Sequence, residues 1–239
     1  MAEPNAVLAL NSSRSSAELT RARSHYETRT NDVEAAWRYG RACYESARWA
    51  TNRAAKSKTA QKGVEVCRWL VAQHPEMASA HYYLSLNLGE YADTKRSLAA
   101  LGMVREMEKE FKKTTELDEH FDYAGADRAL GLLYQQAPAI GSIGSRSKAR
   151  QHFRRALELS PEFPENRLVL IEADLAWGEA GAARREITAL EQDWSEARLR
   201  FTGSEWEPTW SDWEARLAVA KRKSDAAASH APVPSPRNK

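Results

Sequence analysis

The side chains that could take part in acid–base or metal chemistry are scattered along this chain of 239 residues. Its six histidines show no His-x-x-x-His spacing and no glutamate placed as in a zinc hydrolase. Asp118–His120 offers two carboxylates and an imidazole, but an acidic turn at a helix end explains this segment better than a metal site. No nucleophile elbow, phosphate-binding loop or dinucleotide fingerprint is present. We therefore expect no catalytic site, no metal and no cofactor.

A second set of side chains could bind a ligand without reacting with it. Arginines and tyrosines occur at matching places in a repeated helical pattern, so they would line one groove. Such a groove suits an acidic peptide or another carboxylate. The alternative is that the arginines pair with glutamates of neighbouring helices. The expected groove residues are Arg38, Tyr82, Tyr83, Asn87, Arg128 and Gln135.

A loop rich in glycine and serine forms a third candidate. Residues 136–145 contain Pro138, Gly141 and Gly144, which predict a true loop rather than a longer helix. Free N–H groups at the start of the next helix can hold an anion, whereas an ordinary capped loop is the alternative. The expected edge-loop residues are Ser142, Gly144, Ser145 and Arg146.

The elements that position these side chains are paired helices, and the pattern is clearest over residues 129–161. Leu130-Gly131-x-x-Tyr134 is followed by Ala149-x-x-x-Phe153-x-x-Ala156 and then Pro161, as in the tetratricopeptide (TPR) repeat. Gly131 allows the two helices to approach closely because it has no Cβ. Since one such pair cannot bury its apolar face alone, several pairs must stack. We predict an all-α, TPR-like α-solenoid of about four helix pairs with a C-terminal capping helix.

Three of the four repeats carry extra residues between their two helices. From Tyr44 to Gly63 and from Leu88 to Met107 the separation is nineteen residues, and from Tyr134 to Ala149 it is fifteen. In a solenoid such additions fall on one edge. In the first two repeats they are either loops or longer helices.

The predicted domain organisation has a flexible lead, one repeat domain and a tail. Residues 1–30 form the lead, with a short helix around residues 17–23. The repeat domain spans residues 31–223, and Asn31-Asp32 caps its first helix. Its capping helix lies at about residues 208–222, where a tryptophan stripe seals the last repeat. Residues 224–239 are rich in Ala, Ser and Pro and are expected to be disordered.

Composition excludes several classes of protein. The chain is 42% hydrophobic and 28% charged with a net charge of +2, so no basic face for nucleic acid is expected. No apolar run is long enough to span a membrane. Cys43 and Cys67 lie on separate predicted helices and are expected to be buried thiols. We expect a soluble protein, cytoplasmic if the chain is complete and periplasmic if a leader has been removed.

Beyond the repeat itself, three segments resemble one branch of the TPR superfamily. Asn87–Glu90, Phe121–Gly131 and Ala137-Pro138 are similar to the TRAP-transporter T-component proteins and the related regulators of microtubule dynamics. This resemblance covers roughly residues 33–195. It implies a helical-repeat protein that associates with a substrate-binding protein. The T-components are periplasmic lipoproteins, and no lipobox cysteine lies near the start of this chain.

The sequence thus favours a non-enzymatic scaffold that binds an unidentified protein or peptide partner, similar to the T-components. The alternative is a carrier that holds a small organic acid in a pocket of the solenoid. Self-association is left open.

Overall fold

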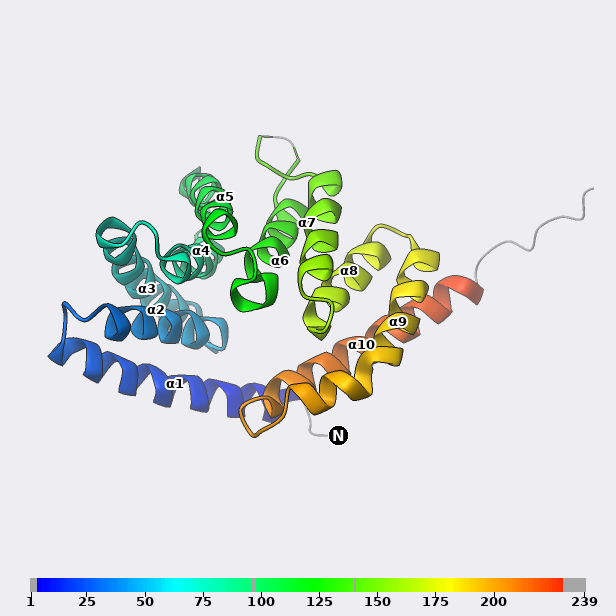
Figure 1. The fold of residues 1–239 in the computed structure, drawn as a ribbon, viewed down its shortest axis with the longest axis horizontal. Coiled ribbons are helices and arrows are strands. Elements are labelled where there is room, and N and C mark those ends of the chain that lie inside the picture. Colours follow the sequence, from blue (N-terminus) through cyan, green and yellow to red (C-terminus); the bar gives the residue numbers. More distant parts are fainter. Residues whose placement is uncertain (1–3, 96–97, 140, 230–239) are drawn as a thin grey trace, which may run out of the picture. The chain divides into compact units, whose positions relative to one another are not determined.

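The computed structural model describes residues 4–95, 98–139 and 141–229 (Figure 1). These residues form helices and no strands, in two compact units that divide after Leu159. The first unit contains α1 (Pro4–Thr28), α2 (Val33–Arg48), α3 (Arg53–Gln73), α4 (Ala78–Asp93), α5 (Leu98–Leu117), α6 (Phe121–Gln136) and α7 (Arg146–Leu159). The second contains α8 (Pro164–Ala176), α9 (Ala180–Arg200) and α10 (Glu207–Ser229).

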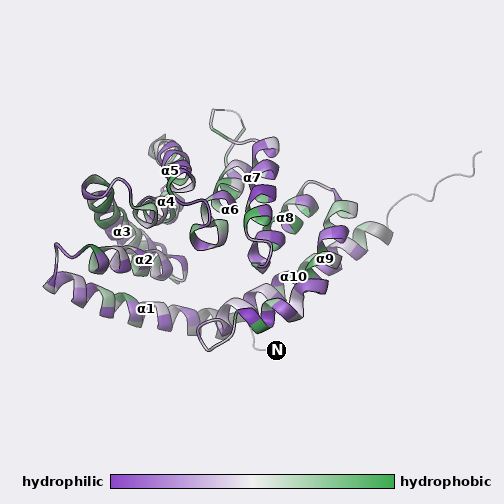
Figure 2. Ribbon diagram, viewed as in Figure 1, coloured by the Kyte–Doolittle hydropathy of each residue, from purple (hydrophilic) through white to green (hydrophobic). Residues whose placement is uncertain are grey.

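The helices pack as the repeat pattern predicts. In the first unit α2 lies against α3, α4 against α5 and α6 against α7, while α4 is also a neighbour of both α2 and α6 (Figure 1). In the second unit α8 lies against α9. Polar and apolar residues both occur along these helices (Figure 2), which lets each helix bury one side and expose the other. The expected all-α, TPR-like solenoid is confirmed.

The helix starts follow from local capping chemistry. The Asp32 carboxylate accepts hydrogen bonds from the backbone N–H groups of Glu34 and Ala35, so the predicted cap before Val33 is present. The Asn52 side chain caps α3 in the same way, through the N–H of Ala55. Pro164 occupies the first turn of α8, where its missing N–H costs no hydrogen bond.

Glycines allow the two helices of a pair to interlock. A Cβ on Gly131 would lie 2.4 Å from the ring of Phe153, and one on Gly40 would lie 2.5 Å from the Cys67 sulfur. Cys67 precedes Pro75 by the same eight residues that separate Phe153 from Pro161. The two contacts are therefore equivalent, and they place Gly40 at the position of Gly131.

The extra residues of the first two repeats lengthen helices. α3 has 21 residues and α5 has 20, compared with 14 in α7, and α2 ends only a few residues before α3 begins. In the third repeat a loop follows α6, as the glycines and the proline predict. The sequence left loops and longer helices open for the first two repeats, and the structure has longer helices.

The N-terminal segment differs from the expected flexible lead. Instead of a short helix around residues 17–23, the structure has one helix of 25 residues, α1, which packs on α2. Leu19 and Tyr26 of α1 lie against the core formed by α2 and α3, and the Tyr26 and Tyr39 rings stack with centroids 5.3 Å apart. The residues of α1 that pack at this core, Leu19, Ala22 and Tyr26, lie in its C-terminal half.

The second unit is closed by α10, which packs on α8 and α9. Trp210 and Trp213 are 2% and 1% exposed, as expected of a stripe that seals the last repeat. Arg216 forms ion pairs with Glu165 and Glu172 of α8. α10 continues to Ser229, so the expected disorder is wrong for residues 224–229, while residues 230–239 lie outside the described part of the chain.

Within the described residues, none of the helices combines the length and apolar character needed to span a bilayer.

Candidate functional site

The first helices of the first three repeats present a shared surface, which we call the α2–α4–α6 face. We define it by residues that interact through ring contacts, hydrogen bonds or their charges. They are Trp37, Arg41, Tyr44 and Glu45 of α2, Tyr82 and Tyr83 of α4, and Phe121, Asp122 and Arg128 of α6.

The centre of the α2–α4–α6 face is a carboxylate held by two side chains. The Tyr82 hydroxyl donates a hydrogen bond of 2.6 Å to Asp122 Oδ2, and Arg128 Nη2 lies 3.1 Å from the same oxygen. The Arg128 guanidinium also donates to the backbone carbonyl of Tyr123. Burial and the Asp122 charge raise the pKa of Tyr82 well above its ordinary value, so Tyr82 acts as a neutral donor.

An unusual backbone turn carries Asp122. Asp122, Tyr123 and Ala124 have φ values of 52°, 56° and 57°, so three consecutive residues with side chains adopt the left-handed conformation. This conformation is unfavourable for L-residues other than glycine, at about 1–2 kcal/mol each. The regular part of α6 begins after this turn, where Gly125 packs against the Tyr82 hydroxyl with no room for a Cβ.

Aromatic rings surround this contact. Trp37 stacks on Tyr83, with centroids 6.0 Å apart and an interplanar angle of 22°. Tyr82 packs edge-on against both Tyr83 and Phe121, with centroids 5.3 Å apart in each case. Tyr82 and Tyr83 are largely buried whereas Trp37, Tyr44 and Phe121 are half-buried, so these three rings are the more open to a ligand.

In the first repeat, the residue that lies on this surface is one position earlier in the sequence than expected. α2, α4 and α8 begin seven residues before Gly40, Ser85 and Ile171 respectively. Trp37, not Arg38, therefore corresponds to Tyr82 and Arg128. Arg38 is exposed and pairs with Glu34 of its own helix at 2.7 Å, the kind of ion pair the alternative interpretation named, although within one helix.

The same register reveals residues of α2 that the sequence analysis missed. Arg41, Tyr44 and Glu45 follow Trp37 at helical spacing, on the side that faces α4. Burial raises the pKa of Glu45 above its ordinary value against the opposing charges of Arg48 and Arg41, and burial raises the pKa of Tyr44 to about 12. Neither the Arg41 nor the Glu45 side chain forms a hydrogen bond or ion pair within the described part of the chain.

Of the two remaining groove candidates, Asn87 lies beneath this surface, and the place of Gln135 in the groove stays a prediction. Asn87 is fully buried, where its amide donates to the carbonyls of Gly40 and Tyr83. It therefore supports the α2–α4–α6 face from beneath. Gln135 is half-buried, two helical turns after Arg128 and near the end of α6.

The edge loop is an ordinary capped loop in the structure. The Ser145 hydroxyl accepts from the N–H of Lys148, and its carbonyl accepts from Ala149, so this serine starts α7. Gly144 donates to the carbonyl of Pro138, and a Cβ there would clash with the backbone. Ser142 is half-buried and Arg146 is exposed. An anion at this helix start stays a prediction.

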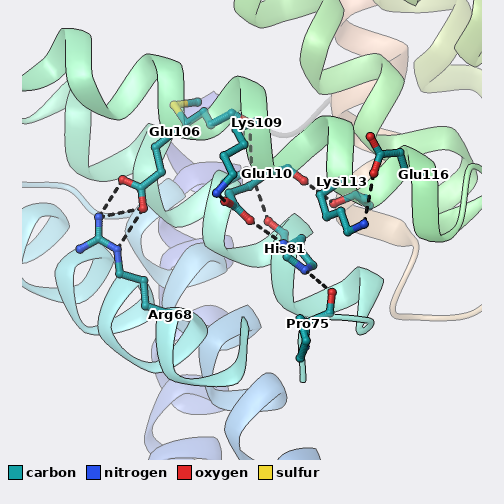
Figure 3. Close-up of polar contacts among 11 residues, drawn as sticks. Arg68, Pro75, His81, Glu106, Lys109, Glu110, Lys113 and Glu116 are labelled. Atoms are coloured by element: carbon teal, nitrogen blue, oxygen red, sulfur yellow. Dashed lines mark hydrogen bonds and ion pairs between the residues drawn. The ribbon is translucent and has the colours of Figure 1, made fainter. Parts of the chain in front are cut away.

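Ion pairs join the two helices of three successive repeats at one equivalent position. His81 of α4 lies 2.5 Å from Glu110 of α5 and 2.9 Å from the Pro75 carbonyl (Figure 3). Both of its ring nitrogens therefore face acceptors. In the third repeat Asp127 of α6 accepts from His152 of α7 at 2.7 Å, with acid and base exchanged. The fourth repeat has Arg167 and Glu186, at 2.6 Å.

These pairs give a structural role to His81 and His152, two of the histidines that show no catalytic or metal-binding spacing in the sequence. The first repeat carries Ala36 and Val66 at the same position, both buried. A more exposed pair, Arg68 of α3 with Glu106 of α5, joins neighbouring repeats (Figure 3). No cluster of three or more metal-ligating side chains occurs among the described residues. At Asp118–His120 the Asp118 carboxylate accepts from the His120 backbone, which is the expected helix-end turn.

Comparison with known proteins agrees with the fold. A sequence profile of the family "Regulator of microtubule dynamics protein 1-3" matches residues 7–124. The crystal structure of TTC0263, a thermophilic TPR protein of Thermus thermophilus, aligns over 88% of this chain and 92% of its own with a TM-score of 0.66 and 19% identity. A structure of MamA aligns over 74% of this chain and 87% of its own, with a TM-score of 0.49 and 15% identity. None of the curated proteins matches the sequence.

The chain is a TPR-like helical repeat protein. Its likeness to TTC0263 concerns the fold, since the identity is low. The fold is typical of scaffolds that bind other proteins.

Proposed function

We propose that this chain is a non-enzymatic scaffold whose α2–α4–α6 face binds a segment of a protein partner. The observation that carries this proposal is the group formed by Arg41, Tyr44 and Glu45 beside the half-buried ring of Trp37. Arg41 and Glu45 have charges without an ion pair in the described chain. Tryptophan, tyrosine and arginine are enriched where proteins bind one another.

Capture of a partner from cell extract tests this proposal when it is compared between two matched variants. Arg41→Glu reverses a charge on the α2–α4–α6 face, whereas Arg185→Glu makes the same change on the exposed side of α9. Arg41→Glu should reduce capture of the partner at least tenfold, while Arg185→Glu should leave it unchanged. Equal capture by both variants would exclude this face. Arg128 is less suitable for this experiment because it also holds the left-handed turn in the first part of α6.

The resemblance to TRAP-transporter T-components suggests a first partner to test. It would be the substrate-binding protein of such a transporter, and this partner would place the chain in the periplasm. Direct binding of the two purified proteins, with the same two variants, decides whether this finer assignment holds.

A small organic acid is the second candidate ligand, because Tyr82 and Arg128 already hold a carboxylate. A ligand that binds only the folded chain raises its melting temperature in proportion to the logarithm of ligand concentration. A thermal-shift screen of dicarboxylates separates the two functions: a saturable shift favours the carrier, and partner capture without such a shift favours the scaffold.

A further inference from the structure

The left-handed turn at residues 122–124, in the first part of α6, is absent from the other first helices. The other first helices begin from extended residues, namely Asp32, Met77 and Phe163, with φ between −81° and −91°. Only α6 begins from three left-handed residues. Because this backbone is unfavourable, contacts elsewhere must hold it in place.

The contacts of this turn centre on Tyr82 and Arg128: both reach the Asp122 carboxylate, and Arg128 also donates to the backbone carbonyls of Asp122 and Tyr123. Tyr82 is 4% exposed, and the Arg128 side chain is 11% exposed. A guanidinium so far from solvent needs an anionic partner, since removing that partner would leave a buried charge unpaired. The Asp122 side chain, in contrast, is 40% exposed, so it can leave for solvent at little cost in hydration.

A carboxylate from outside could satisfy the same donors without the strained turn. It would accept the same hydrogen bond from Tyr82 and pair with the same Arg128 charge. Residues 122–124 could then relax to ordinary backbone conformations. The exchange replaces one carboxylate by another and releases the strain, so the charges balance. The hydrogen bonds that Arg128 donates to the carbonyls of Asp122 and Tyr123 would pass to the incoming peptide or to water.

We propose that Asp122 is a built-in occupant of a carboxylate site formed by Tyr82 and Arg128, and that an acidic side chain of the partner peptide displaces it. This inference rests on the proposed function and names the chemistry of the partner. The site lies beside Trp37, Arg41 and Tyr44, which would bind the flanking residues of the peptide. Asp122 then lowers the affinity of the resting protein for acidic sequences.

The experiment measures binding of a fluorescein-labelled hexaglutamate peptide by fluorescence polarisation, with hexaglutamine as the control probe. Asp122→Asn removes the competing charge and should bind hexaglutamate at least tenfold more tightly than the natural sequence. Adding Arg128→Gln to Asp122→Asn should abolish that gain. Asp122→Gly removes the carboxylate while tolerating left-handed φ, so it should show a similar gain even if the asparagine variant folds poorly.

Two results would overturn the inference. One is that neither Asp122 variant binds hexaglutamate more tightly, and the other is that the gain survives Arg128→Gln. If succinate displaces hexaglutamate from Asp122→Asn at concentrations equal to those of the free peptide, a small acid rather than a peptide is the ligand. If Arg41→Glu abolishes partner capture while the Asp122 variants show no gain, the docking face stands and only the displaced carboxylate fails.

Discussion

Gly131 of α6 lies against the ring of Phe153 of α7, so closely that a methyl group on the glycine would come within 2.4 Å of the ring. Phe153 is fully buried and Ala149 and Ala156 flank it on the same face of α7. The ring is therefore enclosed by protein atoms. The contact fixes how α6 and α7 interlock.

Replacing this glycine should destabilise the first unit. In Gly131→Ala, overpacking costs about 1–3 kcal/mol, and the better helix propensity of alanine returns only about 1 kcal/mol. We expect a net loss of up to about 2 kcal/mol of unfolding free energy, measured by urea denaturation. Gly102→Ala in α5 is the matched control, because a Cβ there meets nothing within 4 Å. It should be neutral or stabilising, and an equal loss in both variants would contradict the interlocking contact.

The exchanged acid and base of the second and third repeats predict that the second pair can be reversed. His81→Asp alone brings two carboxylates together in a buried site, and Glu110→His alone leaves the imidazoles unpaired, so each should cost about 3–5 kcal/mol. The double variant copies Asp127 and His152 and should recover at least about 2 kcal/mol, a coupling typical of residues in contact. Chemical denaturation of the four proteins forms the required cycle.

The exposed pair of Arg68 and Glu106 provides the comparison for this cycle. The Arg68 side chain is 54% exposed, so solvent screens its charge. Arg68→Glu should change stability by about 1 kcal/mol or less. If the double variant at His81 and Glu110 loses as much stability as the single variants, the acid and the base cannot be exchanged at this position.

The raised pKa of Glu45 predicts a pH-dependent gain of stability in Glu45→Gln. Burial disfavours the charged carboxylate in the folded chain. The folded state therefore binds the Glu45 proton more tightly than the unfolded state does. The penalty is absent below the ordinary glutamate pKa of about 4.3, grows as pH rises from there to the folded pKa and is complete above it. The variant should melt a few degrees higher at pH 7, on the scale of about 2–4 °C per kcal/mol, and show no gain near pH 4. A gain that is the same at both pH values would contradict this origin.

The buried cysteines predict thiols that react only after unfolding. Burial raises the pKa of Cys43 to about 12 and also raises that of Cys67, so almost no thiolate exists at pH 8. Ellman's reagent should find no reactive thiol in the native protein and both thiols in guanidinium chloride. Ser24→Cys on the exposed side of α1 should react at once. Rapid reaction of the native chain would show that α2 and α3 open readily.

The architecture could be read from the sequence because the repeat depends on a few packing residues. Gly131, Phe153 and Pro161 specify two interlocked helices and their end, whatever the remaining residues are. The register of the first repeat failed because α6 carries an extra turn. That turn hides the seven-residue separation between a helix start and its packing residue, which α2 and α4 share. Comparing Val33 with Ala78 would have placed Trp37 correctly.

The centre of the site could not be predicted because it depends on backbone conformation. Nothing in the types of Asp122, Tyr123 and Ala124 signals a left-handed turn, since none is glycine. The partners of Asp122 are 40 residues earlier, at Tyr82, and six residues later, at Arg128. Their meeting follows from the stacking of α4 on α6, which a linear pattern does not show.

Site-specific photo-crosslinking tests the α2–α4–α6 face most directly. A benzophenone amino acid replaces Tyr44 on the face in one protein and Lys62, an exposed residue of α3, in the other. Each of the two proteins is mixed with the captured partner and irradiated, and the adducts are mapped by mass spectrometry. The account predicts an adduct between the partner and position 44 and none at position 62. An adduct at position 62 with none at position 44 would contradict it.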